Sequence, residues 1–143
     1  MNYPPFEPAP ASIRRGSRWQ RVALVFVFLW FFLGGLAHFL LTDAEMSIVP
    51  PELPSPRALV LVSGVCELLG AFGLLRERTR RAAGWGLVLL TIAVTPANIY
   101  MLRMHEQFPV PEWLLWLRLP FQLVLLWLIW WGSRWRARRP MYR

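Results

Sequence analysis

The sequence has no lysine, a single cysteine and few charged residues. Charged residues make up 17% of its 143 residues, whereas soluble domains carry about 25%. This low proportion argues against an ordinary soluble domain. The single Cys66 excludes a disulfide framework within one chain. The sequence also contains no glycine-rich phosphate loop, nucleophile elbow, metal-ligand spacing, or haem or cluster motif.

Long apolar runs dominate what is present. Hydrophobic residues make up 56% of the chain, aromatic residues 15%, and the mean hydropathy is +0.38. The apolar residues form four blocks, at residues 22–41, 58–75, 82–102 and 113–131. Runs of this length can span a hydrocarbon core of about 30 Å as helices, which satisfy their own backbone hydrogen bonds in lipid. We therefore predict an all-α, polytopic membrane four-helix bundle over residues 22–132, with an N-terminal tail at 1–21 and a basic tail at 133–143.

The distribution of arginine predicts the orientation of this bundle. Four arginines precede the first block, four lie in the second loop and five lie in the C-terminal tail, so thirteen of the sixteen fall on one side. Positively charged flanks face the cytoplasm, which places both termini there. The net charge of +8 could indicate nucleic-acid binding. We reject nucleic acid as a partner because the arginines flank apolar blocks, and we expect the lipid bilayer as the partner.

Five ionisable or amide side chains fall inside the apolar blocks, where they are costly and mark candidate functional sites. They are His38, Glu67, Asn98, Arg118 and Gln122. At about 1.5 Å per residue, all five lie at the midplane or in the outer half of the membrane. We therefore predict a polar pocket that opens outward and is built from all four helices.

Each of these residues has an expected role in the pocket. A carboxylate at the midplane must be paired or protonated, so we expect Glu67 at the pocket floor with Arg118 as its charge partner. Glu67 and His38 are the candidate catalytic residues, because both can exchange protons. Asn98, Arg118 and Gln122 are the candidate ligand-binding residues. The alternative is structural: a Glu67–Arg118 ion pair and interhelical amide hydrogen bonds that only fix helix register.

Other residues shape the expected bundle. Pro96 and Pro120 should kink their helices, and the proline-rich segment 49–56 should be extended, either covering the outer mouth or serving as a connector. Cys66 is expected as small packing, with thiol redox chemistry as the alternative. Small residues should let the helices pack closely. They are Gly34, Gly35, Gly64, Gly70, Gly73, Gly84 and Gly86.

An ordered set of short segments carries a family resemblance. The segments are GLAHF (35–39), VPPELPSP (49–56), SGVCEL (63–68), GAFGLL (70–75), TRR (79–81), PANIY (96–100) and RLPFQ (118–122). Together they resemble the DoxX-like family of small bacterial four-helix membrane proteins. The resemblance implies a multi-pass protein of the bacterial inner membrane. Some relatives are quinone-reducing subunits of a thiosulfate:quinone oxidoreductase, others belong to redox-stress complexes, and distant ones are assembly factors.

Three functional hypotheses follow. The first is a redox-associated, quinone-linked oxidoreductase subunit, with no intrinsic cofactor or metal, that binds a quinone or similar lipophile. A membrane or periplasmic redox protein would supply electrons, and the chain could form a homodimer. The second is a non-catalytic assembly or scaffold subunit. The third is a small-solute transporter, which is disfavoured because four helices are few for alternating access unless the chain dimerises.

Overall fold

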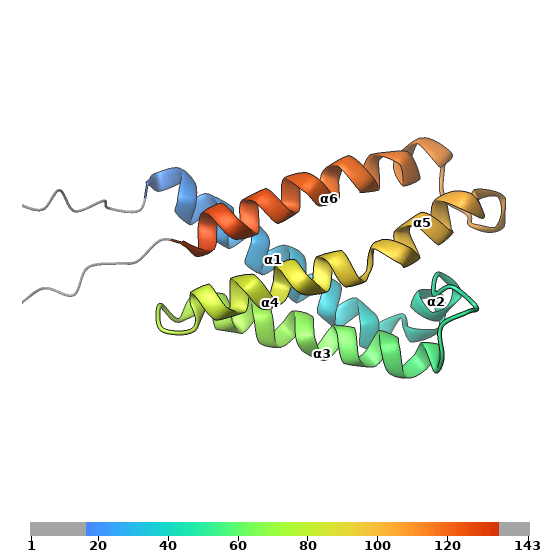
Figure 1. The fold of residues 1–143 in the computed structure, drawn as a ribbon, viewed down its shortest axis with the longest axis horizontal. Coiled ribbons are helices and arrows are strands. Elements are labelled where there is room, and N and C mark those ends of the chain that lie inside the picture. The colour runs from blue at the N-terminus through green and yellow to red at the C-terminus, as the bar shows by residue number, and fades with distance from the viewer. Residues whose placement is uncertain (1–16, 135–143) are drawn as a thin grey trace, which may run out of the picture.

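The computed structural model describes residues 17–134, and every regular element within that range is helical. The elements are α1 (Arg18–Leu40), α2 (Thr42–Ser47), α3 (Pro56–Leu75), α4 (Arg80–Ala93), α5 (Thr95–Arg103), the short 3-10 helix η1 (His105–Gln107) and α6 (Glu112–Ser133). Figure 1 shows the long helices running side by side along one axis. Residues 1–16 and 135–143, which include most of both predicted tails, lie outside the described residues.

Four spans are long and apolar enough to cross a membrane, which confirms the predicted polytopic four-helix bundle. They are α1, α3, the combined stretch Arg80–Arg103, and α6. Only about a fifth of each span is buried inside the protein. The remaining apolar surface suits lipid, which solvates such side chains as well as a protein core does.

Local sequence explains where the helices begin and break. Ser17 caps α1 in a capping box with Gln20, so this helix starts four residues before the predicted apolar block. Pro56 occupies the first turn of α3, where its missing N–H is not needed. Pro96 lacks the N–H that would continue the ladder, and the third span divides at Val94 into α4 and α5. In contrast, α6 continues through Pro120.

The apolar core lies nearer one end of the bundle than the other. We call the end that holds residues 17 and 134 and the α3–α4 turn the terminal end, and the end that holds α2 and the α5–α6 loop the loop end (Figure 1). The main apolar core lies toward the terminal end, where α1, α3, α4 and α6 meet. It consists of Val27, Phe31, Ala71, Leu74, Leu87, Leu125 and Ile129.

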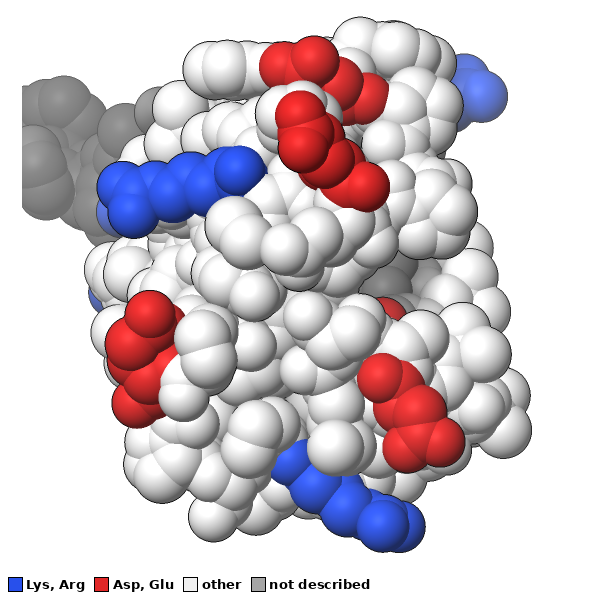
Figure 2. Space-filling model, turned by 90° about the vertical axis from the view of Figure 1, so that its right-hand side faces the viewer, with Lys and Arg blue, Asp and Glu red and all other residues white. Residues whose placement is uncertain are grey.

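Acidic and basic residues are distributed unequally between the loop end and the terminal end. Of the seven acidic residues within 17–134, five lie at the loop end, namely Asp43, Glu45, Glu52, Glu106 and Glu112. Glu67 lies within α3, and Glu77 lies in the α3–α4 turn, close in sequence to Arg76, Arg78, Arg80 and Arg81. Figure 2 looks onto the loop end and shows carboxylates and a few arginines separated by uncharged surface. The concentration of arginine at the terminal end is typical of the cytoplasmic side of a membrane protein.

Candidate functional site

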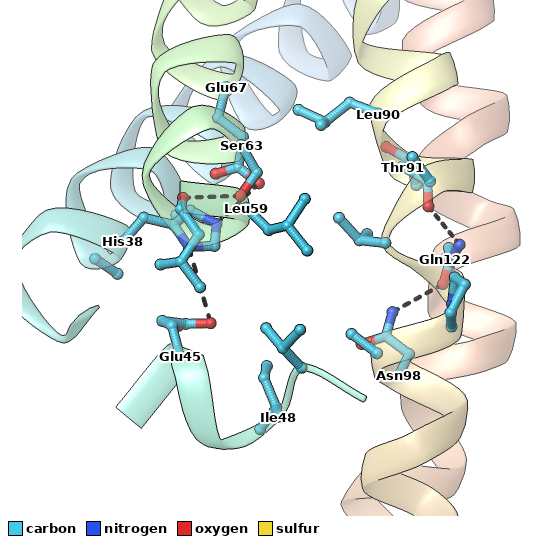
Figure 3. Close-up of a pocket in the computed structure, with 18 of the residues that line it drawn as sticks. His38, Glu45, Ile48, Leu59, Ser63, Glu67, Leu90, Thr91, Asn98 and Gln122 are labelled. Atoms are coloured by element: carbon cyan, nitrogen blue, oxygen red, sulfur yellow. Dashed lines mark hydrogen bonds and ion pairs between the residues drawn. The ribbon is translucent and has the colours of Figure 1, made fainter. Parts of the chain in front are cut away.

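A cavity of about 730 Å³ occupies the half of the bundle nearer the loop end. Side chains from α1, α2, α3, α4, α5 and α6 line it, together with part of the α2–α3 loop. The five polar residues singled out from the sequence all belong to this lining, so the predicted convergence into one pocket is confirmed. Figure 3 shows two polar walls that face each other across apolar side chains.

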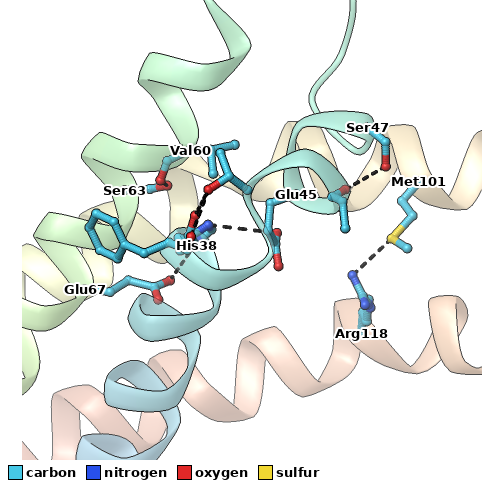
Figure 4. Close-up of polar contacts among 11 residues, drawn as sticks. His38, Glu45, Ser47, Val60, Ser63, Glu67, Met101 and Arg118 are labelled. Carbon is cyan, nitrogen blue, oxygen red and sulfur yellow. Dashed lines mark hydrogen bonds and ion pairs between the residues drawn. The ribbon is translucent and has the colours of Figure 1, made fainter.

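The first wall is a row of three titratable side chains from three helices. His38 Nε2 lies 3.6 Å from Glu67 Oε1, and His38 Nδ1 lies 3.9 Å from Glu45 Oε2 (Figure 4). The side chains of His38, Glu67 and Glu45 are 15%, 14% and 27% exposed. The imidazole therefore stands between two carboxylates, and it forms an ion pair with each when it carries a proton.

Two polar atoms of this wall are buried without a hydrogen-bond partner among the described residues. They are His38 Nδ1 and Glu67 Oε2. A buried polar atom that lacks a partner costs about 1–3 kcal/mol, so such atoms are uncommon unless a ligand or water completes them. Both belong to residues that line the cavity, so a bound molecule can supply the missing partner.

Two glycines make room for this wall. A Cβ on Gly34 would lie 2.8 Å from Glu67 Oε2, and a Cβ on Gly64 would lie 2.8 Å from His38 Cβ. The absence of side chains at these positions lets α1 and α3 approach closely and brings the imidazole to the carboxylate. The expectation that small residues permit close helix packing is confirmed here. The same expectation is wrong for Gly86, because a Cβ on this residue would meet no atom within 4 Å, so no helix packs closely against it.

The second wall is a network of amides and hydroxyls. Gln122 Nε2 donates to the Thr91 carbonyl oxygen at 2.7 Å and to Thr95 Oγ1 at 2.6 Å. Asn98 Nδ2 donates to Gln122 Oε1 at 2.9 Å. The network joins α4, α5 and α6, and Figure 3 shows it opposite His38 and Glu67. Gln122 is buried and its Nε2 donates twice, which fixes the side chain with Oε1 toward the Asn98 amide.

The predicted charge pair between Glu67 and Arg118 is wrong. The basic partner of Glu67 is His38. Arg118 is exposed on α6, and its Nη1 donates to Met101 Sδ at 3.1 Å (Figure 4). Glu67 lies on α3 with its carboxylate toward α1, where a Cβ on Gly34 would lie 2.8 Å from Glu67 Oε2, whereas Arg118 lies on α6. Arg118 still lines the cavity.

Glu45 is a site residue that the sequence analysis does not identify, because it falls between the predicted blocks 22–41 and 58–75. The short helix α2 folds this residue back onto His38, and the only signal in the sequence was an acidic residue seven positions after the histidine. The α2–α3 loop lines the cavity through Val49, Pro50 and Leu53, which favours covering the pocket over serving only as a connector. The expectation that this segment is extended is wrong at its centre, because the Leu53 N–H donates to the Pro50 carbonyl oxygen in a turn. Cys66 is exposed on the outer face of α3, so the expectation that it packs inside the bundle is wrong.

No group of three or more His, Cys, Asp or Glu residues suitable for a metal ion occurs within residues 17–134. The fold and cavity define a multi-pass four-helix membrane protein with a polar-walled pocket near one end. The chain belongs to the family described as Domain of unknown function (DUF8561), whose model matches residues 24–134. No curated protein and no solved structure matches the chain.

Proposed function

We propose that this protein is a membrane subunit that binds a quinone or a similar lipophilic molecule with an oxygen-bearing head group. The observation that carries the proposal is the pocket itself: about 730 Å³, apolar for most of its lining, with a titratable wall facing an amide wall. Pockets for small molecules have this composition, with a few placed polar groups that orient the ligand.

The sides of the pocket favour a ligand that arrives from the bilayer. Leu33 on α1 and Val62 on α3 both line the cavity, yet each is 60% exposed on the apolar surface of a span. An opening bordered by such residues faces lipid tails rather than water. A lipophile can then enter sideways and leave its apolar tail among the acyl chains.

The polar walls favour a head group with carbonyl or hydroxyl oxygens. Arg118 and Asn98 supply N–H donors on one side, while His38 and Glu67 can donate or accept a proton on the other. Reduction of a quinone to a quinol takes up two electrons and two protons. His38 and Glu67 would pass the protons, with Glu45 between them and the loop-end surface. A partner redox protein would supply the electrons.

The resemblance to DoxX-like proteins supports the same proposal, because some of those relatives are quinone-reducing membrane subunits. On the same basis we propose that the chain lies in the bacterial inner membrane with its terminal end in the cytoplasm, an orientation that the excess of arginine at that end supports. On this arrangement the pocket lies in the outer half of the bilayer. A periplasmic or membrane partner could then reach the loop end.

A second candidate function is that of an assembly or scaffold subunit. The amide network is the observation that favours this function. The hydrogen bonds from Gln122 and Asn98 join three helices and would fix their register without any ligand. They do not account for the unpartnered atoms of His38 and Glu67, which lie on the opposite wall. For this reason we place ligand binding first.

The test is mass spectrometry of molecules that co-purify with the protein in nanodiscs made directly from the native membrane. Wild-type protein is compared with Glu67→Gln and with Glu77→Gln, which makes the same chemical change in the α3–α4 turn outside the pocket. We expect a quinone or another single lipophile in wild type and Glu77→Gln, and its loss in Glu67→Gln. The same bulk lipids in all three samples would refute the pocket proposal and favour the scaffold.

A further inference from the structure

A second, smaller cavity of about 110 Å³ lies at the terminal end, between the first half of α4 and the last turn of α6. It does not share a residue with the large pocket. Its lining consists of Arg81, Gly84, Trp85, Val88, Trp130, Ser133 and Arg134. We call this site the terminal notch.

The inner side of the terminal notch is closed by a close approach of the two helices. A Cβ on Gly84 would lie 2.5 Å from both Cβ and Oγ of Ser133, so no side chain larger than hydrogen fits there. Ser133 itself is buried, and its hydroxyl donates to the Trp130 carbonyl oxygen. The notch is therefore a shallow, walled depression rather than a gap that runs through the bundle.

The outer sides of the notch carry positive charge and indole rings. The Arg134 guanidinium lies 4.4 Å from the centre of the Trp130 ring, an arrangement that holds the charge in place by a cation–π contact. Arg81 lies on the α4 side, and Trp85 and Trp130 are 53% and 42% exposed. No acidic residue lines the notch, and neither Arg81 nor Arg134 forms an ion pair in the part of the chain that the structure describes.

We propose that the terminal notch binds the phosphate of an anionic phospholipid. Two guanidinium groups on one small depression match the oxygen atoms of a phosphodiester, which they can contact in a bidentate manner. The volume admits a phosphate and part of its glycerol but not acyl chains. The chains would continue along the exposed apolar surface of α4 and α6, beside Trp85, which favours a lipid over free phosphate.

This inference is independent of the proposed quinone pocket. Clusters of basic residues where spanning helices end commonly recognise anionic head groups. The notch differs from a general basic surface because two arginines, two tryptophans and a closed inner side occur together. It should select one lipid molecule rather than concentrate anionic lipids broadly.

The experiment uses full-length protein in nanodiscs of phosphatidylcholine and phosphatidylglycerol at a ratio of about four to one, with native mass spectrometry of the lipids retained after release. The Arg81→Gln/Arg134→Gln variant is compared with Arg76→Gln/Arg78→Gln, which removes the same charge from the neighbouring turn. We expect one tightly held phosphatidylglycerol in wild type, retention about tenfold weaker in the notch variant, and less than about twofold weaker in the control.

Three outcomes of the lipid-retention experiment would overturn the proposal. Equal losses in both variants would show general surface attraction, and unchanged retention in the notch variant would place the lipid elsewhere. Release of the lipid from wild type by millimolar inorganic phosphate would identify a free-anion site. Quenching of tryptophan fluorescence by lipids with brominated chains provides a second measurement, in which the notch variant is subtracted because the chain has nine tryptophans. Quenching by brominated phosphatidylglycerol should exceed quenching by brominated phosphatidylcholine in wild type, and this excess should fall in Arg81→Gln/Arg134→Gln; an unchanged excess contradicts the proposal.

Discussion

The contact between α3 and α4 makes a quantitative prediction at Gly70. A Cβ at this position would lie 2.6 Å from Leu87 Cγ. Carbon atoms in proteins rest about 3.5–4.0 Å apart, so about 1 Å of movement is required. Leu87 is 1% exposed and belongs to the main apolar core, so neither its side chain nor the backbone beside it has free space to move into. The substitution Gly70→Ala should therefore strain the core.

The expected loss follows from comparison with Gly86→Ala. A Cβ on Gly86 meets nothing within 4 Å, so that variant changes helix propensity alone. Alanine is favoured over glycine in a helix by about 1 kcal/mol, a gain that both variants share and that cancels in their difference. Overpacking a core costs about 1–3 kcal/mol. We expect Gly70→Ala to be less stable than Gly86→Ala by about this amount.

The assay is reversible unfolding of the protein in mixed micelles by titration with sodium dodecyl sulfate, followed by circular dichroism. Wild type and both variants are measured at one protein and lipid concentration, because membrane-protein stability depends on both. The free energy of unfolding should fall for Gly70→Ala and stay level or rise for Gly86→Ala. Equal stabilities of the two variants would refute the packing described for α3 and α4.

Other positions test the pocket and its surroundings. Gly34→Ala should leave the unfolding free energy within about 1 kcal/mol of wild type, because the added Cβ meets only the far end of the Glu67 side chain. The substitution should nevertheless abolish the co-purifying lipophile, since it displaces the Glu67 carboxylate. A lipophile that is still retained in nanodiscs would contradict this expectation. Gln122→Leu should lower the unfolding free energy by about 1–3 kcal/mol in the same titration, since its buried partners lose their hydrogen bonds; unchanged stability would show that these bonds contribute nothing net. His105→Gln should change the unfolding free energy by less than about 0.5 kcal/mol, because the contact between His105 and Glu112 is exposed. A larger loss would reveal a structural role for His105 beyond this contact.

Hydropathy predicted the spans well because lipid imposes one simple requirement. Every backbone polar group in the hydrocarbon region must be paired within its own helix, so a run of about 20 apolar residues has little choice of structure. The observed spans begin and end within a few residues of the predicted blocks. The helix α2 was missed because six residues between spans carry no such requirement.

Depth along a helix could be predicted, but rotation about its axis could not. The rise per residue placed all five polar side chains at the midplane or in the outer half of the membrane, and the structure brings them to one cavity. The wrong Glu67–Arg118 pair and the wrong placement of Cys66 are both errors of rotation. Adjacent residues of a helix point about 100° apart, so Cys66 faces outward while its neighbour faces the pocket.

The separation of core and pocket along the bundle bears on the choice between ligand binding and a scaffold role. The main core lies toward the terminal end, where four helices pack on one another through apolar side chains. Residues needed only to fix register would be expected within that packed part, where a polar contact excludes other arrangements. Gln122 also lines the cavity, but its amide nitrogen and oxygen both have hydrogen-bond partners, which fits a residue that fixes register. His38 and Glu67 differ in that each leaves a buried polar atom without a hydrogen-bond partner beside the cavity, which suits residues that complete their hydrogen bonds with a bound molecule.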